Sequence, residues 1–308
     1  MKDQIKWVLN RMPKSDDQQL SIMALPNVAK ARFFHGSFPQ YSVTPLARLD
    51  GMAKYLGLGG LYVKDESYRF GLNAFKVLGG SFAMARYIAS EMGRDVSEMT
   101  YDYLTSEAFR KEFGQATFFT ATDGNHGRGV AWAANKLGQK AVVHMPKGSS
   151  QSRYDNIARE GAQVTIEDVN YDDCVRMAAA EAAETKHGVV VQDTAWEGYE
   201  EIPTWIMQGY GTMASEAAEQ MRQIGVNRPT HVFIRPASAP WPARWSASSP
   251  TSSPMIRPSS SSWRLAQPTV SMRVLWPATA TLVSSRVISK PSWPVLPAAS
   301  PTSSPGIS

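Results

Sequence analysis

One lysine and one glycine-rich loop are the parts of this sequence whose residue types could do chemistry. Lys76 lies in the segment NAFKVLGG, between apolar residues and just before two glycines. Apolar neighbours remove water from a lysine ammonium, which lowers its pKa and yields a free amine. Such an amine attacks carbonyl groups and forms a Schiff base. The alternative is a lysine whose stem lies along a helix surface with its charge in water, and this segment alone leaves both open.

The loop TATDGNHGRG is the second candidate. Gly124 and Gly127 allow a ligand to approach the backbone closely. The N–H groups at the start of the following helix would suit a carboxylate or a phosphate. Asp123 adds an acid–base group and Asn125 a hydrogen-bonding amide, whereas His126 is expected to support the loop. Taken alone, an Asp-Gly-Asn sequence is often only a turn.

Alternating strands and helices must position these groups. The apolar patterns predict strands at 61–63, 116–122, 140–146, 163–168, 189–195 and 230–234. They predict helices at 73–92, 130–138, 152–161, 171–188 and 204–225, the first with Asn73 as its N-cap. This alternation is typical of βαβ units around a parallel sheet, an α/β fold. Because ligands bind beyond the carboxyl ends of such strands, the loop at 123–129, the segment QDTAWEG and the residues after THVFI should share one edge.

Composition excludes several functional classes. The 308 residues carry a formal net charge of +5, but residues 235–308 hold seven basic and no acidic residues. The remaining residues 1–234 have 25 basic against 27 acidic residues. Because this region lacks the excess of positive charge that is typical of nucleic-acid-binding proteins, the composition argues against a nucleic-acid partner. Cys174 is the only cysteine, which fits a reducing cytoplasm. No signal peptide is evident at the start, and no apolar run is long enough to span a membrane.

Several segments, in order, resemble the fold-type II pyridoxal-phosphate enzymes, the family of threonine dehydratase and the tryptophan synthase β subunit. They are TPLARLD, VKDES, NAFKVLGG and the Gly-Asn-His-Gly loop. Five longer segments resemble the branch of that family that acts on 2,3-diaminopropionate: TDGNHGRGVAWAA, MPKGS, NYDDCVR, VVQDTAWEGY and IPTWIMQGY. The resemblance covers nearly all of 35–234. Most dehydratases of the family have a serine at the position of Asp123.

The resemblance implies parallel sheets flanked by helices, with residues 1–234 forming a catalytic region of two interleaved subdomains. Lys76 would hold pyridoxal 5'-phosphate, and Asn125 would hydrogen-bond the cofactor's ring hydroxyl. Asp123 would stand beside the α-carbon of the substrate, next to the substrate-binding Gly124. Asp193 would help to recognise the substrate's amino groups, although a helix N-cap or a turn residue is an alternative for it.

The implied activity is the elimination of ammonia from 2,3-diaminopropionate, which gives pyruvate and two ammonia molecules. Carboxylates suit a substrate with two amines, and bases on opposite faces of the α-carbon, Lys76 and Asp123, could serve both enantiomers. The complete protein is expected to be a homodimer with a small amino acid as substrate and no metal. Two rivals stay open: a threonine or serine dehydratase, and a non-catalytic relic that cannot hold the cofactor.

The sequence changes character at Arg235. The resemblance implies a glycine-rich phosphate loop after THVFI, but this chain continues RPASAPWPA and has one glycine, thirteen prolines and nineteen serines in its last 74 residues. A disordered tail is one explanation, because such a composition opposes regular structure. The other is translation in a shifted reading frame, because reading from the third base of each codon permits the sequence AGVGAMAG. We favour the frame shift, whether it is a mutation or a sequencing error, and we expect a disordered tail and impaired activity.

Overall fold

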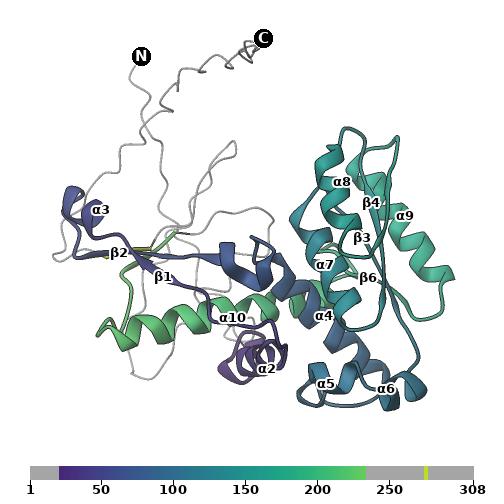
Figure 1. The fold of residues 1–308 in the computed structure, drawn as a ribbon, viewed down its shortest axis with the longest axis horizontal. Coiled ribbons are helices and arrows are strands. Elements are labelled where there is room, and N and C mark those ends of the chain that lie inside the picture. Colours follow the sequence, from purple (N-terminus) through teal and green to yellow (C-terminus); the bar gives the residue numbers. More distant parts are fainter. Residues whose placement is uncertain (1–20, 234–273, 277–308) are drawn as a thin grey trace, which may run out of the picture.

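A parallel four-stranded sheet forms one part of the molecule (Figure 1). The computed structural model describes residues 21–233 and 274–276. The strands are β3 (Thr117–Ala121), β4 (Lys140–Met145), β5 (Gln163–Ile166) and β6 (Gly188–Val190), in the order β5-β4-β3-β6. The connecting helices are α7 (Asn125–Lys136), α8 (Gln151–Ala158) and α9 (Tyr171–Glu184). The predicted α/β class is confirmed.

Helices cover both faces of this sheet, as strands buried on two sides require. Successive side chains of a strand point to opposite faces. Accordingly, Val143 of β4 packs with residues of α7 and α8, whereas its neighbour Val142 packs with Ala178 and Ala182 of α9. Figure 1 shows α7 and α8 on one side of the strands and α9 on the other. The strands can therefore deliver their loops to a common edge.

Two predicted strands belong instead to a second, antiparallel sheet. Its members are β1 (Leu46–Arg48), β2 (Gly60–Lys64), β7 (His231–Val232) and β8 (Val274–Trp276), in the order β1-β2-β8-β7. Helix α3 (Asp50–Tyr55) links β1 to β2, and this short link returns the chain in the opposite direction. The expectation that the strands at 61–63 and 230–234 belong to the parallel sheet was wrong.

The strand β8 differs from the prediction of a tail without regular structure. Its three residues pair with β2 on one side and β7 on the other. The segment Val-Leu-Trp consists of types that favour strands, and the two neighbours offer it a row of unpaired backbone groups on each side. The rest of the predicted tail, 235–273 and 277–308, lies outside the described residues, as does the expected phosphate loop.

Three helices, α2 (Leu25–Gly36), α4 (Lys76–Glu91) and α10 (Glu201–Gln223), form the core between the two sheets (Figure 1). Glycines let α4 and α10 approach closely, because a Cβ at Gly209 would lie 2.3 Å from the carbonyl oxygen of Leu78. Four short segments complete the described fold: η1 (Glu66–Gly71), η2 (Val96–Glu98), α5 (Tyr101–Leu104) and α6 (Glu107–Glu112). Within the described residues, no helix is both long and apolar enough to cross a membrane.

A buried ion network fixes α10 to the segment that leads into α4. Glu216 of α10 is fully buried and contacts Arg69 of η1 and Lys64 of β2, both at 2.7 Å. Glu66 completes the network from the other side of Arg69. Burial alone would raise the pKa of Glu216, but hydrogen bonds and charge from Arg69 and Lys64 lower it to about 2. All four charges therefore have partners of opposite sign.

Both helices that carry candidate residues begin at positions other than those predicted. Asn73 is not the N-cap of α4, because its φ of 55° places it in a left-handed turn with Phe70 and Gly71. The helix starts at Lys76 itself. Helix α7 starts at Asn125 instead of residue 130, so Gly127 and Gly129 lie inside it. Because glycine has a low helix propensity, the sequence indicated a loop where the first turn of α7 lies.

Candidate functional site

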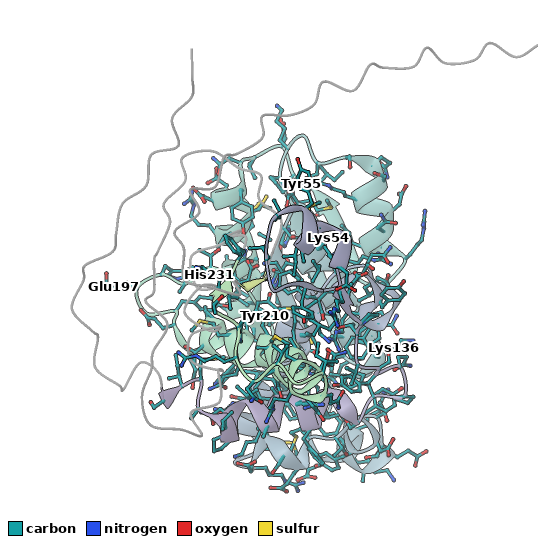
Figure 2. All side chains as sticks on the ribbon, turned by 90° about the vertical axis from the view of Figure 1, so that its left-hand side faces the viewer. Lys54, Tyr55, Lys136, Glu197, Tyr210 and His231 are labelled. Atoms are coloured by element: carbon teal, nitrogen blue, oxygen red, sulfur yellow. The ribbon has the colours of Figure 1, made fainter. Side chains whose placement is uncertain are left out.

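Lys76 and Asp193 meet at the carboxyl edge of the parallel sheet. Lys76 is the first residue of α4, and its Nζ forms an ion pair and hydrogen bond with Oδ2 of Asp193. The two side chains are only 14% and 12% exposed, so Lys76 does not extend along the helix surface. Its Nζ also lies 5.8 Å and 5.9 Å from the ring centroids of Phe75 and Tyr210. Tyr210 lies on α10 in the middle of the molecule (Figure 2).

The Asp193 carboxylate keeps its charge in this buried position. Burial alone would raise its pKa, but the positive charges of His126 and Lys76 and the hydrogen bond from Lys76 lower it to about 2. Burial also lowers the pKa of His126, so this imidazole is uncharged at neutral pH and adds its positive charge beside Asp193 only at lower pH, after it takes up a proton. Lys76 is therefore the cation that holds Asp193 ionised.

His126 supports the backbone beside Asp193. A carbonyl oxygen only accepts hydrogen bonds, so Nε2 of His126 carries the proton and donates to the carbonyl of Val191 at 2.7 Å. Nδ1 then has a free lone pair, which lies 3.9 Å from Oδ2 of Asp193. This buried Nδ1 has no hydrogen-bond partner among the described residues. The arrangement agrees with the expected supporting role.

The glycine loop presents backbone donors at the start of α7. The hydroxyl oxygen of Thr122 accepts hydrogen bonds from the N–H groups of Gly124 at 3.1 Å and Gly127 at 3.3 Å. The N–H groups of Asn125 and His126 lie between them in the first turn, and within the described part of the chain they have no acceptor. Because these donors sit at a helix N-terminus, they suit an anionic group.

Asp123 lies on the same edge but is bound to a different partner. It follows β3, and Asp193 follows the neighbouring strand β6. The Asp123 carboxylate is 69% exposed and pairs with Nη1 of Arg153, on α8, at 2.9 Å. The structure thus brings Lys76 and Asp193 together and ties Asp123 to α8. A hollow of about 200 Å³ adjoins this pair and is lined by Asp123, Gly124, Asn125, Arg128, Arg153, Asn156 and Ile157.

Sequence reasoning missed several residues of this edge, above all Arg153, Tyr171 and Gln192. Tyr171 is the first residue of α9, and its hydroxyl accepts a hydrogen bond from the side chain of Gln192. Burial raises the pKa of Tyr171, and the negative charges of Asp193 and Asp123 add to this. The position of Gln192 directly before Asp193 was the one available signal, because a polar residue there interrupts a strand-like apolar run.

Comparisons with known proteins agree with this geometry. The family model described as "Pyridoxal-phosphate dependent enzyme" matches residues 38–237. The diaminopropionate ammonia-lyase of Salmonella typhimurium is 54% identical over 202 residues, which are 66% of this chain and 50% of that protein. The crystal structure of the Escherichia coli enzyme in apo form is 48% identical, with a TM-score of 0.66, over 74% of this chain and 60% of the other. Its complex with D-serine is 50% identical, with a TM-score of 0.62, over 68% and 52%.

Proposed function

Because the chain belongs to the pyridoxal-phosphate dependent enzymes, we propose that it derives from a lyase that removes ammonia from 2,3-diaminopropionate. The chain spans about half the length of the curated relatives it matches. Their names support the reaction type, and the identity above 50% over two thirds of this chain supports the substrate. The residues of the site supply the rest of the argument.

The described residues fit the aldehyde and ring of pyridoxal 5'-phosphate. The amine of Lys76 would hold the aldehyde, and the amide of Asn125 would hydrogen-bond the ring hydroxyl. The unpartnered Nδ1 of His126 and the free N–H groups at the start of α7 are polar groups that a polar ligand would satisfy. When bound, this cofactor withdraws electrons from the α-carbon of an amino acid.

The observation that carries the proposal is a pair of carboxylates, Asp123 and Asp193, that follow neighbouring strands at one edge of the sheet, where Asp193 pairs with Lys76. A substrate with two ammonium groups needs negative charge, which a neutral hydroxyl at position 123 would not supply. Asp193 would recognise the amino groups, and the α7 N-terminus would receive the substrate carboxylate.

Proton transfer would fall to Lys76 and Asp123, one on each face of the α-carbon. Asp123 must first leave Arg153, and this exchange costs little because an exposed ion pair contributes less than about 1 kcal/mol. Loss of the α-proton and of the β-amine gives 2-aminoacrylate. Water converts this product to pyruvate and a second ammonia.

We also propose that residues 235–308 are translated out of frame, and that 1–234 form the two interleaved subdomains of the catalytic region. The family match ends at residue 237, where the expected phosphate loop would follow, and this supports the frame shift.

The complete protein would be a cytoplasmic homodimer. The lone Cys174 supports the compartment. The exposed apolar residues Leu25 and Phe33 of α2 support a subunit contact.

Trapping of the cofactor tests the proposal. We expect sodium borohydride to link pyridoxal phosphate to Lys76, and peptide mass spectrometry to locate the adduct. The experiment needs the frame-restored version, in which the codons from Arg235 onward are read in the shifted frame. Lys76→Ala should abolish both the adduct and pyruvate formation from 2,3-diaminopropionate. Lys54→Ala is the matched control, because Lys54 is exposed on α3 (Figure 2).

An adduct that persists in Lys76→Ala would show that another lysine carries the cofactor. Faster turnover of threonine or serine than of diaminopropionate would favour the dehydratase instead. Resequencing the gene across codons 230–240 decides whether the frame shift is present in the gene.

A further inference from the structure

The side chain of Gln192 extends the pairing of β3 and β6 by one step. The residue is 1% exposed and directly precedes Asp193. Its Oε1 accepts hydrogen bonds from the N–H of Ala121 at 3.1 Å and from the hydroxyl of Thr120 at 2.9 Å. Its Nε2 donates to the carbonyl of Ala121 at 3.1 Å. The amide thus pairs with both backbone groups of the last residue of β3, as a neighbouring strand would.

Two tyrosines fix the same residue from other sides. Nε2 of Gln192 also donates to the hydroxyl of Tyr171, at the start of α9. The backbone N–H of Gln192 donates to the hydroxyl of Tyr199 at 2.8 Å, and that hydroxyl donates to the carbonyl of Val190 at 2.8 Å. The side-chain amide therefore has one possible orientation, because a rotated amide would place donor against donor at Ala121.

These hydrogen bonds hold the segment that leads to Asp123 next to the segment that carries Asp193. Asp123 lies two residues after Ala121, and Asp193 lies one residue after Gln192. Residues 191–199, here called the Asp193 loop, are also held by His126 at Val191 and by Lys76 at Asp193. Within the loop, the rings of Trp196 and Tyr199 stack on each other. Glu197, in the same loop, projects from the body of the molecule (Figure 2). The loop is anchored at its start and open at its tip.

We propose that Gln192 is a positioning residue, which holds the Asp193 loop against the strand that leads to Asp123 and so keeps the carboxylate of Asp193 against Lys76. The inference rests on the proposed function in taking these three residues as one site. The hydrogen bonds themselves do not depend on any cofactor. The residue acts through Asp193 and does not itself touch the reacting groups.

Gln192→Met tests the proposal, because methionine keeps the length and removes the donor and the acceptor. In the 308-residue chain, hydrogen-exchange mass spectrometry should show exchange in the Asp193 loop faster by about tenfold or more, since several hydrogen bonds are lost. Exchange in β4 should stay unchanged. In NMR titration, the pKa of Asp193 should rise from about 2 towards its ordinary value as the carboxylate leaves Lys76.

Gln139→Met is the matched control. Gln139 is also buried and also pairs with backbone, accepting from Ala116 at 2.8 Å and donating to Leu137 at 2.9 Å. It lies at the opposite edge of the same sheet, where β4 begins. This variant should destabilise the chain without changing the pKa of Asp193. An equal rise of that pKa in both variants would reduce Gln192 to a structural role and overturn the proposal.

Tyr171→Phe is a milder second variant, which removes one partner of Gln192 and should speed exchange in the Asp193 loop about fivefold. If Gln192→Met unfolds the whole chain, this variant decides. Unchanged exchange in the loop would overturn the proposal. Borohydride trapping at Lys76 reports separately on the proposed function, so that either proposal can fail without the other.

Discussion

Asp193 stays ionised because Lys76 lies against it, and this makes its contribution to stability depend on pH. Its pKa falls from 3.8 in the unfolded chain to about 2 in the fold, which corresponds to about 2 kcal/mol. A lowered carboxyl pKa stabilises the fold fully above the unfolded value. That stabilisation is lost as the pH falls through about 2, because the folded carboxylate then takes up its proton.

Asp193→Asn should therefore lower the free energy of unfolding by about 2 kcal/mol at pH 7, since Lys76 loses its buried partner. The difference from the unsubstituted chain should shrink between pH 4 and pH 2. Urea unfolding across this range measures it. Asp168→Asn is the control, because Asp168 is exposed and its one ion pair among the described residues is with exposed Lys147. A pH-independent difference would mean that Asp193 acts through packing.

Asp123→Asn should impair one enantiomer of diaminopropionate in the frame-restored version by about 10²–10⁴ in kcat/KM, because one positioned base typically contributes that factor. Lys76 would still serve the opposite face. Steady-state rates of pyruvate formation with each enantiomer measure the effect. Equal losses for both enantiomers would point to a binding role for Asp123.

The sequence was most informative about residues that carry charge or occupy motifs. Lys76 and Asp193, 117 positions apart, were both identified as candidates, and the structure pairs them. Arg153 was not identified, because its role depends on how close α8 lies to Asp123, and no local sequence pattern encodes that distance. Glu216 was also not identified. A glutamate on a long helix is usually exposed to solvent, and only tertiary packing shows that this one is buried.

At the scale of elements, close contact between α4 and α7 sets the position of Lys76. A Cβ at Gly129 would lie 2.8 Å from the backbone N and Cα of Val77 and 3.2 Å from the carbonyl carbon of Lys76. Because the obstructing atoms are backbone, the helices themselves would have to separate. Gly129 therefore allows α7 to contact the first turn of α4.

Gly129→Ala should destabilise the fold by about 1–3 kcal/mol, the usual cost of overpacking, and should lower the yield of the Lys76 adduct. Gly51→Ala is the control, because a Cβ at Gly51 on α3 meets no atom within 4 Å. There the gain in helix propensity should leave stability equal or slightly higher. Urea midpoints and borohydride trapping provide the two measurements. A stable Gly129→Ala with full trapping would contradict the close-contact argument.

The strands and helices of the parallel sheet were predicted well, because β3, β4 and β5 and their helices show clear apolar periods. The segments before residue 60 and between 94 and 114 were not. Three of their helices, α3, α5 and α6, have four to six residues, too short for a helical period to appear. Helix α2 has 12 residues, but its apolar residues are spread over exposed and buried positions, which obscures its period. Sheet membership was the other failure: β2 and β7 look like parallel strands in sequence, and only the long-range pairing with β8 and β1 places them elsewhere.

At the scale of the whole molecule, the decisive feature is the sequence that follows β7. The phosphate is the main charged anchor of pyridoxal phosphate, and a glycine-rich loop binds it by bringing backbone N–H groups close. At the position of the expected loop, residues 235–243, this chain has the sequence RPASAPWPA. Its three prolines have no N–H to donate, and its side chains prevent a close approach. The proposed cofactor-binding groups that remain are Lys76, Asn125 and the start of α7, which would contact other parts of the cofactor.

The 308-residue chain should therefore be inactive even when pyridoxal phosphate is added in excess, whereas the frame-restored version should release pyruvate from diaminopropionate. Trapping at Lys76 should require far more cofactor in the 308-residue chain, because the aldehyde would have to bind without its phosphate anchor. Lactate dehydrogenase coupled to NADH measures pyruvate in both proteins, and titration of the borohydride adduct compares their affinities. Removal of residues 277–308 is the control, because this cut keeps β8 and should change neither result. Comparable turnover by the two proteins would show that the missing glycine loop is not needed to hold the cofactor.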